Sequence, residues 1–230
     1  MESEKITYRA ERRRWYDDAC AAAHALDLVG ERWALLVMRE LMFGPRRFSE
    51  LRADLPGISA NVLTQRLEGL ESAGVLTRFR LPPPASAQVY ELTEWGKEAE
   101  PIFQALGRWA ARSPLHDPTL PFSAASLLLS LRTMLDPARA GDMAARIGLR
   151  LGRERFGVKL AGGRIEIAHG LPDEADAMLE GTPPVLAGLI YGGQPMEALE
   201  AAGALRVEGS HDVVRRFATL FPLPPKAGAG

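Results

Sequence analysis

The fold-deciding stretch covers residues 44–76 and reads GPRRFSELRADLPGISANVLTQRLEGLESAGVL. Two segments within it, Phe48–Leu55 and Ser59–Ala73, carry apolar residues at helical spacing and predict two helices. Pro56-Gly57 separates them with a turn signal. A helix, a short turn and a second helix are the parts of a helix-turn-helix.

The second predicted helix has two unlike faces. Ser59 is a good N-cap, because its hydroxyl can satisfy a backbone N–H of the first turn. At about 100° per residue, three leucines fall on one narrow arc that must face the core: Leu63, Leu67 and Leu70. The opposite face carries Asn61, Thr64, Gln65 and Glu68, and Val62 and Arg66 flank it. Glutamine and arginine can read base edges, so this face predicts DNA contact; an ordinary solvated surface is the alternative.

The segments on either side complete a larger pattern. Ala19–Val29 and Glu31–Met42 predict two helices before the pair, separated by Gly30. Val75–Leu81 and Val89–Thr93 predict a hairpin after it, with Pro82-Pro83-Pro84 in the loop. Glu94–Arg112 is predicted as one further helix. This order is that of a winged helix, in which the hairpin is the wing.

The last predicted helix of this half carries an apolar stripe at coiled-coil-like spacing. Its members are Trp95, Ala99, Ile102, Leu106 and Trp109. Such a stripe packs either on its own domain or on a second copy of the chain.

Overall charge gives no sign of nucleic-acid binding. The 230 residues hold 28 Lys and Arg against 29 Asp and Glu, so a DNA-binding surface has to be a local patch. Arg46 and Arg47 precede Phe48-Ser49 at the start of the first helix of the pair, where they can hold phosphates. Arg78 and Arg80 lie on the first wing strand. Arg12-Arg13-Arg14 is either a DNA-contacting arm or a solvated run of charge.

The second half has a different pattern of apolar residues, prolines and glycines. Three prolines within Ser113–Pro121 predict a linker. Beyond it, Ser123–Leu135 reads as a helix, and alternating runs at 147–151, 156–160 and 165–167 read as an antiparallel meander. A fourth strand is expected at Ala177–Leu179, helices at Pro184–Tyr191 and Met196–Ala202, a strand at Leu205–Glu208 and a last helix at His211–Phe221. These elements predict a separate α+β domain.

The first half resembles the HxlR family of winged-helix regulators over roughly residues 16–112. The residues that carry the resemblance are Cys20, 25–33 (ALDLVGERW), 39–41 (REL), 44–51 (GPRRFSEL), 56–59 (PGIS), 63–67 (LTQRL), 70–71 (LE), 73–76 (AGVL), 90–93 (YELT) and Gly96. The resemblance implies a homodimer formed through terminal helices of the domain. It also implies a thiol-sensing role for a cysteine at the position of Cys20. A depressed pKa and exposure would favour that role, Asp17 and Asp18 would oppose it, and a small buried hydrophobe is the alternative.

Residues 121–222 resemble a sterol-carrier-protein-like domain. The resemblance is carried by 179–182 (LEGT), Leu186, 189–193 (LIYGG), 197–198 (EA), 202–209 (AGALRVEG), Phe217 and 220–221 (LF). It implies a sheet backed by helices around an apolar cavity. The candidate pocket residues are Leu186, Leu189, Ile190, Met196 and Leu199, and a filled core is the alternative.

Together these features predict an α+β chain: a winged helix-turn-helix domain for DNA binding and dimerisation at 1–113, and a sterol-carrier-protein-like domain at 121–222. We expect a dimeric regulator of transcription that binds an inverted repeat in double-stranded DNA and responds to an apolar small molecule or to thiol oxidation. The predicted DNA-contacting residues are Arg46, Arg47, Ser49, Ser59, Asn61, Thr64, Gln65, Arg66, Arg78 and Arg80. The alternative is an apolar-ligand-binding or lipid-binding module whose winged helix serves protein contacts.

Other classes of function find little support in the sequence. His24, His116, His169 and His211 lack the spacing of metal ligands. No paired acid and base, nucleophile motif or phosphate-binding glycine loop is present, so we expect neither an enzyme nor a cofactor. A single cysteine fits a reducing compartment. The charged N-terminus and the lack of a long apolar run lead us to expect a cytoplasmic protein without a membrane segment.

Overall fold

The structure, a computed structural model, describes residues 16–228. The chain divides into two compact units, Met1–Glu98 and Ala99–Gly230. Among the described residues, no helix is both long and apolar enough to cross a bilayer.

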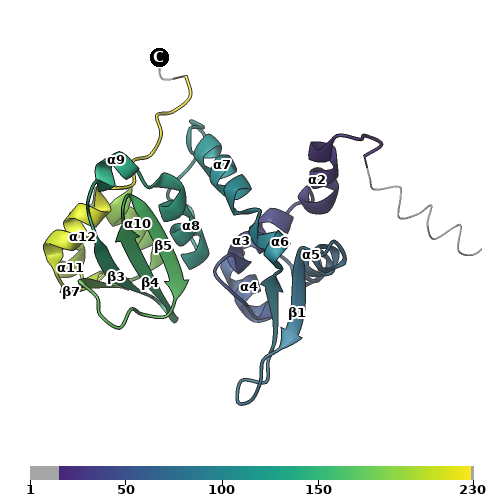
Figure 1. Ribbon diagram of the computed structural model, residues 1–230, viewed down its shortest axis with the longest axis horizontal. Coiled ribbons are helices and arrows are strands. Elements are labelled where there is room, and N and C mark those ends of the chain that lie inside the picture. Colours follow the sequence, from purple (N-terminus) through teal and green to yellow (C-terminus); the bar gives the residue numbers. More distant parts are fainter. Residues whose placement is uncertain (1–15, 229–230) are drawn as a thin grey trace, which may run out of the picture. The chain divides into compact units, whose positions relative to one another are not determined.

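Within residues 16–98, the first unit contains six helices and strands in the expected winged-helix order, followed by one short helix (Figure 1). In chain order they are α2 (Ala21–Val29), α3 (Ala34–Leu41), α4 (Phe48–Asp54), α5 (Ala60–Ser72), β1 (Leu76–Arg80), β2 (Gln88–Leu92) and α6 (Glu94–Lys97). Strands β1 and β2 pair antiparallel, with Leu76 opposite Leu92 and Arg80 opposite Gln88. The predicted winged helix-turn-helix is therefore confirmed for this unit.

A leucine-rich core fixes the helix pair. Leu51 of α4 and Leu63 of α5 are fully buried, as is Val37 of α3. Helix α3 contacts both α4 and α5, and α5 also contacts β1. The turn between α4 and α5 needs glycine, because Gly57 has φ +90°, a left-handed conformation that costs other residues steric strain.

Gly96 lets α6 approach the wing closely. A Cβ at this buried position would lie 2.1 Å from the carbonyl oxygen of Val75. The Thr93 hydroxyl accepts a hydrogen bond from the Gly96 N–H and donates to the carbonyl oxygen of Gly74. The base of the wing is thus tied to the helix that follows it.

The single helix predicted over Glu94–Arg112 is wrong. The chain forms α6, which ends at Lys97, and then α7 (Glu100–Ala111), with Pro101 in the first turn of α7. Proline lacks an N–H, and its ring clashes with the carbonyl group four residues earlier, which here belongs to Lys97. Trp95 therefore lies on α6 and does not continue the apolar stripe of α7.

The helix predicted from Glu31 begins later than expected. It starts at Ala34, because Trp33 has φ 79°, outside the helical region. This residue is half-buried, and its ring faces the turn at Gly57, where a Cβ would lie 3.8 Å from it. The left-handed backbone at Trp33 separates α2 from α3.

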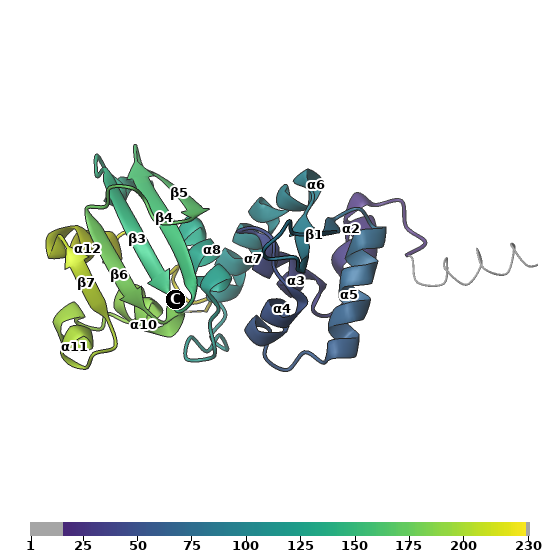
Figure 2. The ribbon, with the colours of Figure 1, turned by 90° about the horizontal axis from the view of Figure 1, so that it is seen from below.

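The second unit is a mixed α/β structure with a five-stranded sheet (Figure 2). Its elements are α7, α8 (Ala124–Met134), α9 (Pro137–Ala140), β3 (Ala145–Leu151), β4 (Glu154–Ala161), β5 (Arg164–His169), β6 (Ala177–Gly181), α10 (Pro183–Ile190), α11 (Met196–Ala201), β7 (Arg206–Gly209) and α12 (His211–Ala218). The predicted meander is confirmed as β3–β4–β5, while the short helix α9 was not predicted. A sterol-carrier-like identity stays a prediction.

The sheet has the strand order β5-β4-β3-β6-β7. Strand β6 pairs parallel with β3, and the other neighbours pair antiparallel. Alternating side chains on one face are buried, among them Leu149, Phe156 and Val158. Helix α8 contacts β5 and α12 contacts β6, so the buried face is the one that the helices cover.

The division between the two units falls at Glu98–Ala99 and not in the predicted linker Ser113–Pro121. The reason is that α7 packs on α8. Glu100 pairs with Arg132 of α8 at 2.6 Å, and Arg108 donates to the carbonyl oxygen of Thr133. At the other end of α7, the Lys226 ammonium group donates to the carbonyl oxygen of Ala111 at 3.0 Å.

Candidate nucleic-acid interface

Helix α5 presents the polar face that its sequence predicts. The Ser59 hydroxyl accepts a hydrogen bond from the Val62 N–H at 3.2 Å, which caps the helix. Leu63, Leu67 and Leu70 are all at most 2% exposed. The side chains of the opposite face are exposed to solvent: Asn61, Thr64, Gln65 and Glu68. The buried leucines hold the helix while its polar face stays free for a ligand.

Arg66 is less available than its sequence position indicates. Its side chain is only 17% exposed and pairs with Glu31, in the segment between α2 and α3, at 3.0 Å. This ion pair joins α5 to the N-terminal helices of the unit. A contact between Arg66 and a base, as predicted from the sequence, would require this ion pair to break.

The two arginines before α4 differ from each other. Arg46 is 9% exposed, forms an ion pair with Asp54, and exchanges backbone hydrogen bonds with Tyr90 of β2. It fastens the start of α4 to the wing, so the expected phosphate contact would require breaking that pair. Arg47 is exposed at the N-cap of α4, and its N–H donates to the Glu50 carboxylate at 2.8 Å. Ser49 in the first turn is exposed as well.

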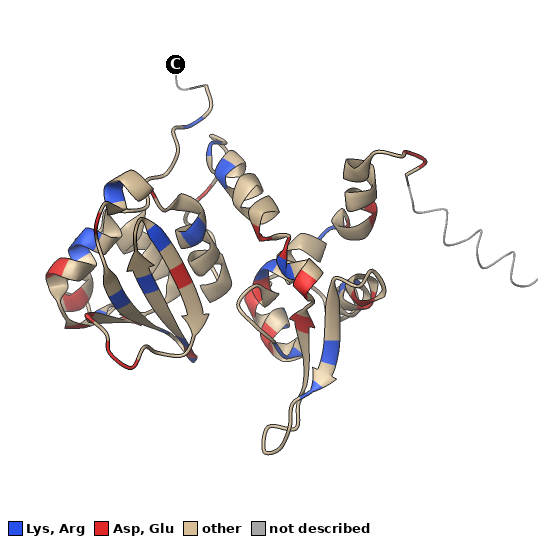
Figure 3. Cartoon of the chain, in the orientation of Figure 1, with Lys and Arg blue, Asp and Glu red and all other residues tan. Residues whose placement is uncertain are grey.

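The wing carries two exposed arginines on β1 (Figure 3). Arg78 pairs with Glu71 of α5 at 3.2 Å and keeps 54% of its side chain exposed. Arg80 lies two residues further along β1, nearer the tip of the wing, and forms no ion pair within the described residues. Both guanidinium groups are open to a phosphate, and that of Arg78 would first leave the half-buried carboxylate of Glu71.

Cys20 is exposed and lies at the N-cap of α2. The backbone N–H groups of Ala22 and, next, Ala23 lower the pKa of its thiol. Asp18 accepts a hydrogen bond from the backbone N–H of Cys20 at 2.9 Å. Of the two expectations for this residue, a buried hydrophobe is thus wrong, and an exposed thiol with a depressed pKa is what the structure shows.

Helix α7 exposes an apolar face. Ile102, Leu106 and Trp109 are 54%, 42% and 75% exposed. With Pro101 and Ala105 they line a shallow hollow of about 520 Å³. Ala111, which is buried, lies on the opposite side of the helix, about 180° from Ile102.

The five predicted pocket residues of the second unit belong mainly to its core. Leu186, Leu189, Ile190 and Met196 are buried, and Leu199 is half-buried. None of the five lines the pocket of about 740 Å³ at the β5 edge of the sheet. Residues 16–228 contain no group of three or more His, Cys, Asp or Glu that could hold a metal ion. The predicted arm Arg12-Arg13-Arg14 lies outside the described residues.

Sequence reasoning missed the acidic partners Glu31, Asp54 and Glu71. Each belongs to a segment other than that of the arginine it pairs with, so no helical spacing along the chain could have shown these pairs. Their effect is to divide the basic residues into two kinds. Arg46 and Arg66 are engaged and mostly buried, whereas Arg47, Arg78 and Arg80 remain exposed.

Comparison with known proteins matches the same part of the chain. Residues 28–116 match the family described as HxlR-like helix-turn-helix. YvaP of Bacillus subtilis, named an uncharacterized HTH-type transcriptional regulator, is 40% identical over 86 residues, which are 37% of this chain and 80% of that protein. The HTH-type transcriptional regulator YodB of the same organism is 38% identical over 86 residues, 77% of its length.

One solved structure is the reduced form of YodB, with 34% identity, coverage of 44% of this chain and 100% of that chain, and a TM-score of 0.39. The family match covers most of the described part of the first unit and α7, and YvaP is 40% identical over 80% of its length. The chain belongs to the HxlR-like helix-turn-helix family.

Proposed function

We propose that this regulator of transcription binds an inverted repeat in double-stranded DNA as a homodimer, with α5 as the recognition helix. The observation that carries the proposal is the exposed face formed by Asn61, Thr64 and Gln65, held rigidly by the buried leucines beneath it. Amide groups can bond bidentately to adenine in the major groove. Residues near the N-terminus of a recognition helix are those that reach base edges.

Contacts to phosphates would come from both sides of α5. Arg47 and the hydroxyls of Ser49 and Ser59 lie at helix starts, where backbone N–H groups also favour anions. Arg78 and Arg80 supply the contacts of the wing. These residues set register on the duplex and carry no sequence information themselves.

The homodimer would form through the apolar face of α7. Three large side chains on one helix, more than two fifths exposed each, are better covered than left in water. A two-fold axis along this face brings two identical stripes together, as an isologous interface requires. Two symmetric recognition helices then demand half-sites about one helical turn apart or a multiple of it.

The second unit would act as a sterol-carrier-like effector domain that binds an apolar small molecule. Its sheet, covered on one face by helices, supports this proposal. An effector regulates DNA binding only if it favours one dimer arrangement over another. The alternative is a ligand-binding module whose winged helix contacts protein, and selection of DNA sites by the purified chain separates the two.

Replacing Arg47 by Gln should weaken DNA binding on every sequence and flatten its dependence on salt. Each lost phosphate contact lowers the slope of log affinity against log salt by about one, so a dimer should lose about two. Affinity is to be measured by electrophoretic mobility shift over a range of salt concentrations, on a site selected from random DNA. Arg52→Gln, which removes an exposed charge from the same helix α4, is the matched control and should retain the wild-type slope.

Three results of this experiment would count against the proposal. If the salt dependence of Arg47→Gln equalled that of the wild type, Arg47 at the start of α4 would not contact a phosphate. An equal change for Arg52→Gln would show a general charge effect without a contact. If the wild-type chain selected no DNA site, the winged helix would serve protein contacts instead.

Cys20 would give the regulator a response to thiol oxidation. The thiolate is the reactive form, and the lowered pKa means that more thiolate is present near neutral pH than in an ordinary cysteine. Because the chain has a single cysteine, iodoacetamide labelling reports on Cys20 alone. Labelling of the folded chain should persist to lower pH than labelling of the same chain unfolded in urea.

Diamide should then change the affinity of the wild-type chain for its DNA site. Cys20→Ser keeps a similar shape without the thiol, and its affinity should not respond to diamide. Identical pH profiles for folded and unfolded chains would contradict the thiolate argument. Equal DNA affinity of oxidised and reduced wild-type protein would contradict the sensing role.

A further inference from the structure

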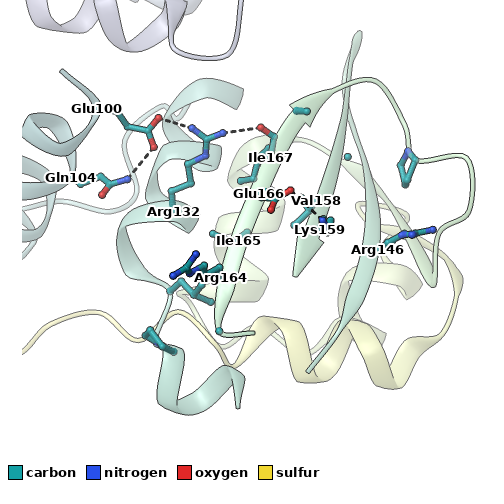
Figure 4. Close-up of a pocket in the computed structure, with 16 residues that line it drawn as sticks. Glu100, Gln104, Arg132, Arg146, Val158, Lys159, Arg164, Ile165, Glu166 and Ile167 are labelled. Atoms are coloured by element: carbon teal, nitrogen blue, oxygen red, sulfur yellow. Dashed lines mark hydrogen bonds and ion pairs between the residues drawn. The ribbon is translucent and has the colours of Figure 1, made fainter. Parts of the chain in front are cut away.

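A pocket of about 740 Å³ lies along strand β5, at the end of the sheet (Figure 4). This volume falls within the range of about 300–1,000 Å³ that is typical of small-molecule sites. β5 is an edge strand whose only neighbour in the sheet is β4. The lining residues come from β3, β4, the β4–β5 turn, β5, the loop at Pro172, helices α7 and α8, and the segment that leads into α9.

Polar side chains from two helices close one part of the pocket. Arg132 of α8 donates to the Glu100 carboxylate at 2.6 Å and to the backbone carbonyl oxygen of Ile167 at 2.8 Å. Gln104 donates to the other carboxylate oxygen of Glu100 at 3.0 Å. Arg132 thus occupies a backbone position on β5 that a further strand would otherwise use. The carbonyl group of Ile167 therefore needs no hydrogen bond from a sixth strand.

Of the cationic side chains that line the pocket, one forms no ion pair. Four cationic side chains face two carboxylates: Arg132, Arg146, Lys159 and Arg164 against Glu100 and Glu166. Arg132 pairs with Glu100, Lys159 with Glu166 at 3.5 Å, and Arg146 with Glu174, outside the pocket, at 3.9 Å. Arg164 forms no ion pair or side-chain hydrogen bond within residues 16–228.

Apolar side chains lie between Arg164 and the Arg132 cluster. Ile165 and Ile167 project from β5 on the side of the helices, and Leu135 and Pro137 face them from the α8–α9 segment. Figure 4 shows Arg132 and Arg164 on one side of β5 and Arg146 on the other. A ligand in this part of the pocket therefore meets an apolar wall and, at its end, a guanidinium group without a partner.

We propose that this pocket binds an apolar carboxylic acid whose carboxylate pairs with Arg164 and whose apolar body lies against Leu135, Ile165 and Ile167. A guanidinium group can bind a carboxylate through two parallel hydrogen bonds, which is stronger than a neutral contact. The apolar wall contributes affinity through the area it removes from water. Both a fatty acid and an aromatic acid satisfy this chemistry.

The site also touches α7, and its regulatory role rests on the proposed function. Glu100 and Gln104 line the pocket, and at about 100° per residue they point away from Ile102 and Trp109 on the same helix. A ligand at the pocket therefore contacts the helix whose other face carries the proposed dimer surface. Such a ligand changes DNA binding if its affinity differs between dimer arrangements.

The test is calorimetric titration of the full chain with dodecanoate and with 2-naphthoate, each compared with its methyl ester. At least one acid should bind about tenfold more tightly than its ester, as expected for one charged contact. Arg164→Gln should abolish that preference. Arg153→Gln, at an exposed position in the β3–β4 turn and outside the pocket, should keep it. Which acid binds distinguishes the two sources of the carboxylate.

Several results would overturn the site: no binding of either acid, equal affinity for acid and ester, or an unchanged preference in Arg164→Gln with a wild-type circular dichroism spectrum. Mobility shifts with the same samples keep the site separate from the proposed function. If the chain bound an acid but no DNA, the acid-binding site would stand and the proposed regulatory function would be rejected. DNA binding without acid binding would reject the site alone.

Discussion

Replacing Trp109 by Glu is expected to convert the dimer into monomers and to abolish tight binding to the inverted repeat. Trp109 is 75% exposed and is the largest side chain of the apolar face of α7, at the C-terminal end of that face. Removing a tryptophan that acts as a hot spot of an interface costs about 2–4 kcal/mol or more, and a homodimer loses two such side chains. Even one such loss raises the dissociation constant of the dimer by about 30- to 700-fold.

The neighbouring residue provides a matched control. Ala110 is exposed, lies outside the hollow formed by Pro101, Ile102, Ala105, Leu106 and Trp109, and gains the same charge in Ala110→Glu. Sedimentation equilibrium should find this variant dimeric and Trp109→Glu monomeric. Operator affinity should follow the same division, because a monomer engages one half-site at a time. A dimeric Trp109→Glu variant would show that the chain associates through another surface.

The helix-turn-helix could be predicted from the sequence because its signals are local. Leucines at positions 63, 67 and 70 identify the buried side of α5, and their near-zero exposure agrees with that assignment. Ser59 and Gly57 mark the start of the helix and the turn before it, through a cap and a left-handed backbone that depend on a few adjacent residues. The meander of the second unit was predictable for the same reason, since strand alternation and glycine turns are local.

The break between α6 and α7 was predictable and was missed. Pro101 cannot lie in the same unbroken helix as Lys97, because its ring would clash with the Lys97 carbonyl group. The spacing of Trp95, Ile102 and Trp109 nevertheless favours a single apolar stripe. An apolar period of this kind does not register the missing N–H and the ring of one proline. The consequence is functional, because the proposed dimer surface now belongs to α7 alone.

The charges of the candidate interface could not be sorted from the sequence. Arg46 and Arg47 are adjacent, yet one is 9% exposed beside Asp54 and the other is open to solvent. Arg66 has the right place in its helix for reading DNA, but it pairs with Glu31. Such pairing depends on how distant segments pack. The parallel pairing of β6 with β3, and the pocket at β5, likewise depend on contacts between remote parts of the chain.

The remaining large effect concerns specificity and belongs to Gln65. This side chain is exposed one turn into α5, and Gln65→Ala removes an amide that can bond to both N6 and N7 of adenine. The loss should cost about 1–3 kcal/mol at one position of each half-site, which is about 5- to 150-fold in affinity. Alanine is also the best helix former, so the free energy of unfolding should not fall and the change in DNA binding can be read directly.

The measurement is selection from random DNA followed by affinity for each single-base variant of the chosen site. Wild-type protein should discriminate at the position under Gln65, and Gln65→Ala should accept all four bases there while keeping its preferences elsewhere. Glu68→Ala, one turn further along the same exposed face, serves as the comparison, because removing an acid near phosphates should raise affinity on all sequences alike. If the base preferences of Gln65→Ala matched those of the wild type at every position, α5 would not be reading the DNA through this face, and specificity would have to come from the wing or from the shape of the duplex.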